Sequence, residues 1–451
     1  MEQRLQTLLE TVKKLLRRGA YPNLSKVLAK IHPADIAHLF RYLDFKDQQT
    51  LYNLIGDTEI AAYVLSELDP GTGAQLLEQL EKSMITEVLQ EMPSDDAVEI
   101  IRGLSEELAE EILQTLKDED SSEIEKLLEY EEDTAGAIMA TEIFSLRDTL
   151  TVDQAIASVQ DAEDVEMVFY VYVTDERNHL VGVLSLRQLL TVPPNTPLKK
   201  VMIDDVIKVS TDVDQEEVAK VVEKYNLLAV PVVNEHNKLM GVVTVDDIID
   251  VLRQEATEDI YKMAGASEEE LLYGYKATKV ARLRLPWLVT NLLGGVVTGY
   301  LMWLFKATLE QIIALISFIP VITGMGGNVG GQSATIVVRG FATGKIDFTT
   351  LRQVFFKELR VGLIMGVVCG MVIGLVAYAW HGNPYLGMVV GIAMTTAMTV
   401  AATMGVVATG FFKKIGIDPA IASSPFVQTA NDITGILIYF GTATMFLNHL
   451  H

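Results

Sequence analysis

The chain has 451 residues and a formal net charge of −24, and this length predicts more than one domain. Only eleven of the 36 Lys and Arg residues and five of the 60 Asp and Glu residues follow Ala277, so the acidic excess lies before it. A surface this acidic repels nucleic acid and attracts cations. The single cysteine, Cys369, excludes disulfide frameworks and thiolate metal sites.

Residues 1–132 are predicted to form an acidic, all-α superhelical N domain. Helix-start signals recur in which Pro is followed by Asp, as at Pro33 and Pro93. Repeated short helices of this kind suggest a small superhelix. The first residues form a charged amphipathic helix and not an apolar signal peptide, which predicts that this half of the chain stays in the cytoplasm.

An internal repeat of strands and helices follows the N domain. The segment around Gly182 recurs around Gly241, at an offset of 59 residues, and each copy reads as helix, strand, turn, strand, helix. The repeat resembles a tandem pair of cystathionine-β-synthase (CBS) domains. That resemblance implies two α/β units, at 137–200 and 201–257, that fold into one disk.

A short motif in the repeat bears on nucleotide binding. In the CBS family, Gly-x-x-Thr/Ser-x-x-Asp often holds a nucleotide ribose. The second unit has this motif as Gly241, Thr244 and Asp247, whereas the first unit has Gln188 at the position of the Asp. The resemblance therefore makes ATP a candidate ligand of the CBS pair, with those three residues of the second unit as its candidate site.

The region 281–451 is predicted to be an α-helical transmembrane domain. A span needs about 20 mostly apolar residues. With five spans, every cluster of Lys and Arg falls on the same side of the bilayer. This predicts a multi-pass protein of the cell (inner or plasma) membrane, with a cytoplasmic N-terminus and an extracytoplasmic C-terminus. The spans lie near 285–305, 311–338, 361–380, 386–412 and 423–447.

Asp432 is the only acidic residue inside these five stretches. A carboxylate in hydrocarbon is costly, so it should face a partner or water. The stretches contain no Lys or Arg to pair with it, and a cation from solution is the partner we expect. The alternative is a protonated structural Asp bonded to a neighbouring helix.

Glycines mark two of the stretches. The centre of the second, residues 324–333, combines glycines with Asn328 and Gln332. Glycines at membrane depth expose carbonyls or break a helix, which is tolerated where the backbone lines protein or a water-filled cavity. Close packing is the alternative, but packing would not require the two amides, so we predict a pore or binding-site lining. From Gly362 to Gly374 glycines recur at every fourth residue, and there the pattern predicts helix packing.

Acidic residues crowd the end of the repeat. Asp247, Asp250 and Glu258 are spaced for one flank of a helix, with Glu255 nearby. A divalent cation would relieve their repulsion, whereas the alternative is a solvated surface. The segment 340–346 lacks the spacing and the Ser/Thr of a phosphate-binding loop, so an ATP-driven pump is not supported, and we expect no enzyme activity.

Taken together, these residues resemble the MgtE family of magnesium channels over the whole chain. The order of parts agrees, with a helical N domain, two CBS units, a long acidic connecting helix at 258–280 and five spans. The most specific marks are the segments from Pro320 to Thr335 and from Ser424 to Gly435, and the run from Glu255 to Asp259.

The resemblance implies a homodimer with a pore on its two-fold axis, built from the second and fifth spans. Asp432 of each subunit would hold hydrated Mg²⁺, an ion that gives up water reluctantly and prefers octahedral oxygen shells. The implied pore lining consists of Gly326, Gly327, Asn328, Gln332, Thr335, Ser424 and Gln428.

Regulatory Mg²⁺ sites are implied in the same way. Asp95 and Glu99 would share an ion with Asp247, and Glu216 with Asp250 would form another bridge. The remaining implied ligands are Glu255, Glu258 and Asp259 on the connecting helix, and Asp418, which would meet that helix through Mg²⁺ and close the pore.

The principal hypothesis is a Mg²⁺-selective channel that mediates magnesium uptake and is closed by cytosolic Mg²⁺ bound between the N domain, the CBS pair and the connecting helix. One alternative is a proton-coupled carrier of other divalent cations, such as Mn²⁺ or Co²⁺. Another is a membrane-anchored nucleotide sensor that conducts nothing, against which Asp432 and the glycine-rich second span argue.

Overall fold

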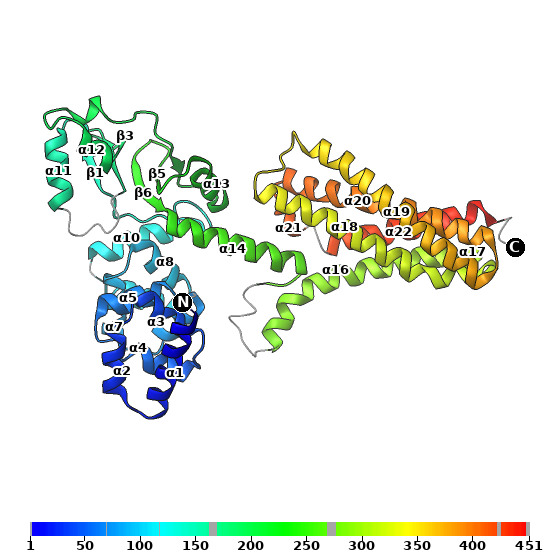
Figure 1. Ribbon diagram of the computed structural model, residues 1–451, viewed down its shortest axis with the longest axis horizontal. Coiled ribbons are helices and arrows are strands. Elements are labelled where there is room, and N and C mark those ends of the chain that lie inside the picture. The colour runs from blue at the N-terminus through cyan, green and yellow to red at the C-terminus, as the bar shows by residue number, and fades with distance from the viewer. Residues whose placement is uncertain are drawn as a thin grey trace. The chain divides into compact units, whose positions relative to one another are not determined.

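The computed structural model describes residues 2–68, 70–116, 118–161, 169–267, 277–421 and 425–447. The chain divides into two compact units, Met1–Leu252 and Arg253–His451. In Figure 1 the colour of the ribbon follows the chain through the helical N domain and the CBS pair to the long helices of the second unit.

Within the described residues, the first unit opens with ten short helices, as predicted for the N domain. Side chains cap several of them, so that Asp44 accepts from Asp47 N at 2.9 Å and Asp57 from Glu59 N at 3.1 Å. Helices two apart in the chain pack together, such as α3 with α5 and α8 with α10, which is superhelical packing. The helices are α1 (Glu2–Arg17), α2 (Tyr21–Leu28), α3 (Pro33–Phe40), α4 (Phe45–Tyr52), α5 (Thr58–Ser66), α6 (Pro70–Leu77), α7 (Lys82–Gln90), α8 (Ser94–Arg102), α9 (Glu106–Leu113) and α10 (Asp118–Leu128).

Two three-stranded sheets follow, one in each CBS unit. β1 (Ser145–Arg147) runs parallel to β2 (Tyr170–Thr174), which runs antiparallel to β3 (Leu180–Ser185). The order recurs in β4, β5 and β6. The remaining elements are α11 (Val152–Asp161), α12 (Leu186–Thr191), the 3₁₀ helix η1 (Leu198–Lys200), β4 (Val209–Ser210), α13 (Gln215–Tyr225), β5 (Ala229–Val233) and β6 (Leu239–Thr244).

The two CBS units repeat each other in register as well as in order. Val173 lies opposite Gly182, Val232 lies opposite Gly241, and each pair is followed by a shift of register. The units also bond to each other reciprocally, because Leu180 N donates to Asn237 O at 3.0 Å and Leu239 N donates to Asn178 O at 3.1 Å. The repeat seen in the sequence is thus a repeat of structure.

One apolar core joins the N domain to the second CBS unit. Val98 and Ile101 of α8 belong to the same buried cluster as Ile248 and Val251 of α14 (Val245–Ala264). All four side chains are 5% exposed or less. This shared core holds the start of α8 against the start of α14, where both helices carry carboxylates.

The connecting helix predicted at 258–280 is not one helix. α14 ends at Ala264, and Gly265 then takes a φ of +70°, a left-handed conformation that ends a helix and suits glycine. The next described helix, α16, begins at Ala277. Residues 268–276, within the predicted connecting helix, lie outside the described part of the chain.

The described residues of the second unit form helices joined by short turns and contain no strand. Four segments are long and apolar enough to cross a membrane, and they are Ala277–Leu304, Ile313–Ala342, Leu351–His381 and Pro384–Lys414. They correspond to the first four predicted spans and agree with a multi-pass protein. The helices are α16 (Ala277–Leu304), α17 (Lys306–Gln311), the 3₁₀ helix η2 (Ile313–Phe318), α18 (Ile319–Ala342), α19 (Leu351–His381), α20 (Pro384–Lys414), α21 (Pro419–Ile421) and α22 (Val427–Met445).

The fifth predicted span corresponds to α22, and the described residues do not confirm it as a span. α22 has 19 residues, but its first half carries Gln428, Asn431 and Asp432, and these side chains lower its hydropathy. Its second half packs Tyr439 and Phe440 into the same apolar cluster as α18 and α20.

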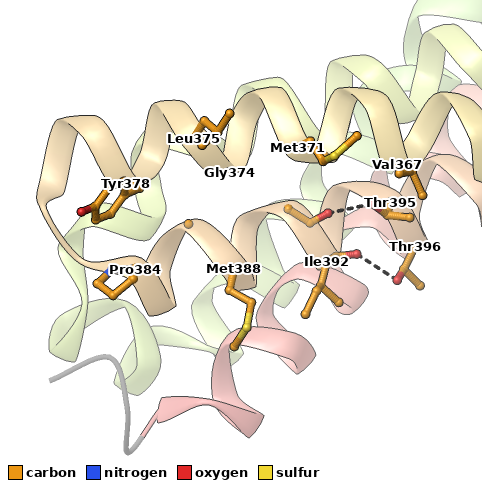
Figure 2. A pocket seen from close by; sticks show the side chains of 13 residues that line it. Val367, Met371, Gly374, Leu375, Tyr378, Pro384, Met388, Ile392, Thr395 and Thr396 are labelled. Atoms are coloured by element: carbon orange, nitrogen blue, oxygen red, sulfur yellow. Dashed lines mark hydrogen bonds between the residues drawn. The ribbon is translucent and has the colours of Figure 1, made fainter.

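The glycine ridge of α19 packs against α20, as its spacing predicted. A Cβ on Gly366 would lie 2.7 Å from Thr395 O, and a Cβ on Gly370 would lie 2.5 Å from Gly391 O. Only glycine permits backbones this close. Figure 2 shows the groove along this hairpin, about 620 Å³ in volume, which is lined by apolar side chains such as Met371 and Ile392. It offers no site for an ion.

Candidate metal sites

α18 carries two different faces. Gly324, Asn328, Gln332 and Thr335 are exposed in the single chain and follow one another at intervals of three or four residues, which places them on one side of a helix. Three of these four residues, Asn328, Gln332 and Thr335, are among those predicted to line a pore. A polar stripe on a membrane helix must face water or protein and not lipid.

The opposite face of α18 is buried by packing. Gly326, Gly330 and Ser333 are buried there, and a Cβ on Gly330 would collide with the side-chain amide of Asn431 in α22. α18 is an unbroken helix from Ile319 to Ala342. Its glycines therefore do not break the helix, which differs from one of the expectations drawn from the sequence. They permit close helix contact, and Gly326 lies in this contact rather than on the polar stripe.

α22 places its polar residues beside α18. Gln428 is exposed, and its Cγ lies 3.5 Å from the position that a Cβ on Gly327 would take. Asp432 is partly exposed and follows Gln428 by four residues, so both lie on one side of α22. The structure thus brings together predicted lining residues from two helices. Ser424, also predicted to line the pore, lies outside the described residues.

A second acidic residue within a spanning helix escaped the sequence analysis. Glu358 belongs to α19 and is 3% exposed, and its Oε2 accepts a hydrogen bond from Ser333 Oγ of α18 at 2.8 Å. Lys357 Nζ lies 3.7 Å from its other oxygen. The predicted spans began after Glu358, so the sequence reading placed it in a connecting loop.

The first unit gathers carboxylates where α8 meets α14. Burial, then repulsion from Asp247, raises the pKa of Asp96 to about 7. Burial, then repulsion from Asp247, also raises the pKa of Asp95 well above its usual range. Burial raises the pKa of Asp247 to about 6, although Thr244 donates two hydrogen bonds to it. Asp96 is an addition to the predicted set.

Glu99 lies at the edge of this cluster. Partial burial, repulsion from Asp250 and repulsion from Asp247 raise its pKa, although its side chain stays in contact with solvent. The prediction that Asp95 and Glu99 face Asp247 agrees with this arrangement. Such crowding favours protonation or a bound cation.

Glu216 forms an ion pair within its own helix. Its Oε2 lies 3.3 Å from Lys220 Nζ, one turn along α13, whereas Asp250 acts on the charges of Glu99 and Asp247. The implied bridge between Glu216 and Asp250 stays a prediction. Lys220 follows Glu216 by four residues, a pairing that the sequence alone could have shown.

The end of α14 meets the segment before α21 through a lysine. Lys262 Nζ lies 2.6 Å from Glu258 Oε1 and 2.7 Å from Asp418 Oδ2. The resemblance implied Mg²⁺ at this contact, and the ammonium group of Lys262 lies beside Asp418 there. Glu255 and Asp259, the other predicted ligands of this helix, are both partly exposed.

The two nucleotide motifs differ in what they can bind. Asp247 of the second unit lies among carboxylates, as described above, and this surrounding does not fit the phosphates of ATP. The backbone is covered in both motifs, because a Cβ on Gly241 would meet Met139 at 2.6 Å and one on Gly182 would collide with Met202. In the first CBS unit Ser185 and Gln188 form a capping box at the start of α12, and Arg187 beside them is exposed.

No group of three or more His, Cys, Asp or Glu side chains in the described part of the chain is arranged to hold a metal ion directly.

Models of known protein families match the chain in the same order as the parts of its fold. A family model for MgtE, described as a divalent cation transporter, matches residues 319–442. A model of the MgtE intracellular N domain matches residues 31–133, and the CBS domain model matches 135–195 and 198–254.

Curated relatives cover most of the chain. The magnesium transporter MgtE of Enterococcus faecalis is 40% identical over 451 residues, which are 100% of this chain and 98% of the relative. The magnesium transporter MgtE of Thermus thermophilus is 41% identical over 322 residues, covering 70% of this chain and 71% of the relative. The protein of the same name from Bacillus subtilis is 39% identical and covers 72% of each.

Solved structures resemble the first unit and the CBS pair within it. The soluble part of a magnesium transporter is 34% identical, with a TM-score of 0.51, and the match covers 56% of this chain and 99% of that one. The cytosolic domain of the Mg²⁺ channel MgtE in complex with ATP is 35% identical, with a TM-score of 0.52, and covers 54% of this chain and 99% of the other.

The fold and the matched models define a multi-pass membrane transport protein with a soluble part that contains an N domain and a CBS pair. The chain belongs to the MgtE family of divalent cation transporters.

Proposed function

We propose that this protein carries Mg²⁺ across the membrane as a channel, and that Mg²⁺ bound to its soluble part closes it. The observation that carries the proposal is the polar stripe of α18, formed by Asn328, Gln332 and Thr335, together with Gln428 and Asp432 of α22. These groups are exposed or partly exposed in one chain. The relatives named magnesium transporter support the choice of ion.

The proposal includes a homodimer. A polar stripe on a membrane helix is tolerated only against water or protein, and a second copy of the chain would cover it and enclose a water-filled path. α22 would then form the fifth span, with its polar side towards the path. Five spans would leave the N-terminus in the cytoplasm and the C-terminus outside.

Selection of the ion follows from its hydration. Mg²⁺ keeps several of its waters, and a path lined by amides, hydroxyls and one carboxylate from each subunit offers hydrogen-bond acceptors to those waters. Asp432 supplies the negative charge.

Regulation would act through the carboxylates between α8 and α14. In the absence of Mg²⁺ their repulsion favours separation of the N domain from the CBS pair, and Mg²⁺ would favour the packed arrangement. A ligand that binds one arrangement better shifts the population towards it.

The first experiment measures Mg²⁺ flux into liposomes that contain the purified protein. Asp432→Asn should abolish flux, while Glu310→Gln, an exposed carboxylate outside the proposed path, should leave it unchanged. Normal flux in folded Asp432→Asn protein would remove Asp432 from the path. Flux driven by an imposed pH gradient would indicate a proton-coupled carrier, and no flux from the unaltered protein would favour a non-conducting sensor.

We also propose that ATP, as the ligand of the CBS pair, binds to the first CBS unit. The support is the exposed Arg187 beside Ser185, against the carboxylates that surround Asp247 in the second unit. Calorimetric titration of the full chain with ATP should give binding that Arg187→Ala weakens and Thr244→Ala does not. The reverse order of effects would return the site to the second unit.

A further inference from the structure

Asn431 of α22 is a polar side chain buried at the contact between the two helices that carry the polar residues. It is 1% exposed, and its Nδ2 donates to Gly326 O of α18 at 3.3 Å. Its Oδ1 is buried and has no hydrogen-bond partner among the described residues. An amide in this position costs stability, since an unpaired buried oxygen has lost its hydrogen bonds to water.

The surface of α18 is shaped around this amide. Gly330 lies one turn after Gly326, and a Cβ there would collide with Nδ2 of Asn431. A Cβ on Gly326 would lie 4.0 Å from Asn431 Cβ. The backbone of Gly326 and the bare Cα of Gly330 therefore border a notch that the Asn431 side chain fills, and only Gly330 must be glycine for the amide to fit. The hydrogen bond from Asn431 to Gly326 O in this notch favours one rotation of α22.

That rotation determines where the next residue points. Successive residues of an α-helix are turned by about 100°, so Asp432 is directed away from the notch when Asn431 is held in it. A leucine at position 431 would fill similar space without the bond to Gly326 O, and it would leave the rotation of α22 to apolar packing alone.

We propose that Asn431 is a positioning residue for ion transport. Its amide keys α22 into the notch formed by Gly326 and Gly330, and so sets the direction of the Asp432 carboxylate and the selection among divalent cations. The inference rests on the proposed role of Asp432, and it adds a residue that does not itself touch the ion.

The test measures selectivity as well as rate. Liposome flux of Mg²⁺ and Ca²⁺ is recorded for Asn431→Leu, normalised to folded protein by size-exclusion chromatography. We expect the Mg²⁺-to-Ca²⁺ flux ratio to fall by about tenfold or more, because small misplacements of a functional group have effects of this size. A merely structural role would reduce the amount of folded protein and leave the ratio unchanged, which would overturn the proposal.

A second variant tests the other wall of the notch. Gly330→Ala should displace the amide and lower the same ratio, whereas Gly299→Ala in α16, where an added Cβ meets nothing within 4 Å, should behave as the unaltered protein. Unchanged selectivity in Gly330→Ala overturns the proposal even if Asn431→Leu fails to fold. If Asp432→Asn itself transports normally, the proposed function fails, and that outcome is distinct from a normal ratio in both notch variants.

Discussion

The ammonium group of Lys262 joins α14 to Asp418, at 2.7 Å from Asp418 Oδ2. Burial by itself would lower the pKa of Lys262, but hydrogen bonds to Asp418 and Glu258 outweigh it and raise the pKa above the usual value of lysine. The group is therefore charged throughout the physiological pH range. It provides, within the chain, a positive charge at a contact where the family resemblance implied Mg²⁺.

Removal of this charge should change how flux responds to Mg²⁺ on the side of the soluble part. In Lys262→Gln, Glu258 and Asp418 face each other without a cation, so we expect more flux at low Mg²⁺. We also expect the inhibition of flux by Mg²⁺ to become steeper, because an added Mg²⁺ must then join the two carboxylates. Liposome flux during Mg²⁺ steps measures both. Lys224→Gln, an exposed lysine of α13, is the control, and an identical inhibition curve in Lys262→Gln would contradict the prediction.

The carboxylates between α8 and α14 should make stability depend on pH. Their pKa values are about 7 for Asp96 and about 6 for Asp247, against an ordinary value of 3.8. A carboxyl whose pKa is raised by folding stabilises the folded state while protonated, fully below its ordinary pKa, and this stability is lost as the pH rises to about 7. We expect the thermal unfolding temperature without Mg²⁺ to fall between pH 5 and pH 8.

Mg²⁺ should compensate for the lost protons. Added Mg²⁺ should raise the unfolding temperature at pH 8 more than at pH 5, and in Asp96→Asn both the pH dependence and this gain should shrink. Each kcal/mol corresponds to roughly 2–4 °C for a domain of this size, which calorimetry resolves. A Mg²⁺ gain equal at the two pH values would show that other groups bind the ion.

The contact between α19 and α20 should be intolerant of added carbon. Gly366→Ala places a Cβ 2.7 Å from Thr395 O, and overpacking of this kind costs about 1–3 kcal/mol. Gly299→Ala, where an added Cβ meets nothing within 4 Å, serves as the matched control. Thermal unfolding in detergent should separate the two variants, and equal stability would mean that the helices shift apart at no cost.

The buried pair of Ser333 and Glu358 should matter more for its hydrogen bond than for its charge. Ser333→Ala leaves a buried carboxylate without its donor and should destabilise the protein by about 1–3 kcal/mol. Glu358→Gln retains the shape and an acceptor, so we expect a smaller loss. Denaturation in detergent compares the two, and a larger loss in Glu358→Gln would show that the charge itself is required, for example by Lys357.

Features that repeat along the chain could be predicted from the sequence. The offset between Gly182 and Gly241 gave the CBS pair, and the spacing of glycines from Gly362 to Gly374 gave a packed face on α19. Both signals are periodic, and a periodic pattern can be recognised in a sequence without knowing which elements pack together in the fold. The juxtaposition of Asp95 with Asp247 came from family resemblance, and the structure has these two carboxylates repelling each other.

Features that depend on which elements meet could not be predicted in this way. The glycines of α18 looked alike in the sequence, but Gly330 lies against Asn431 while Gly331 meets nothing. Lys262 and Asp418 are 156 positions apart, and no local pattern links them. The fifth span stays a prediction because the same polar side chains that suggest an ion path reduce the hydropathy of α22.

The glycine contacts of α20 also bear on which helices can move. Where Gly366 meets Thr395 and Gly330 meets Gly405, one backbone lies directly on another, so sliding would require whole helices to separate. α18, α19 and α20 thus form a fixed frame within the membrane part. α22 packs against this frame through Tyr439 and Phe440, and through the amide of Asn431 beside Gly330. A change in the direction of Asp432 would therefore require that buried amide to leave its place.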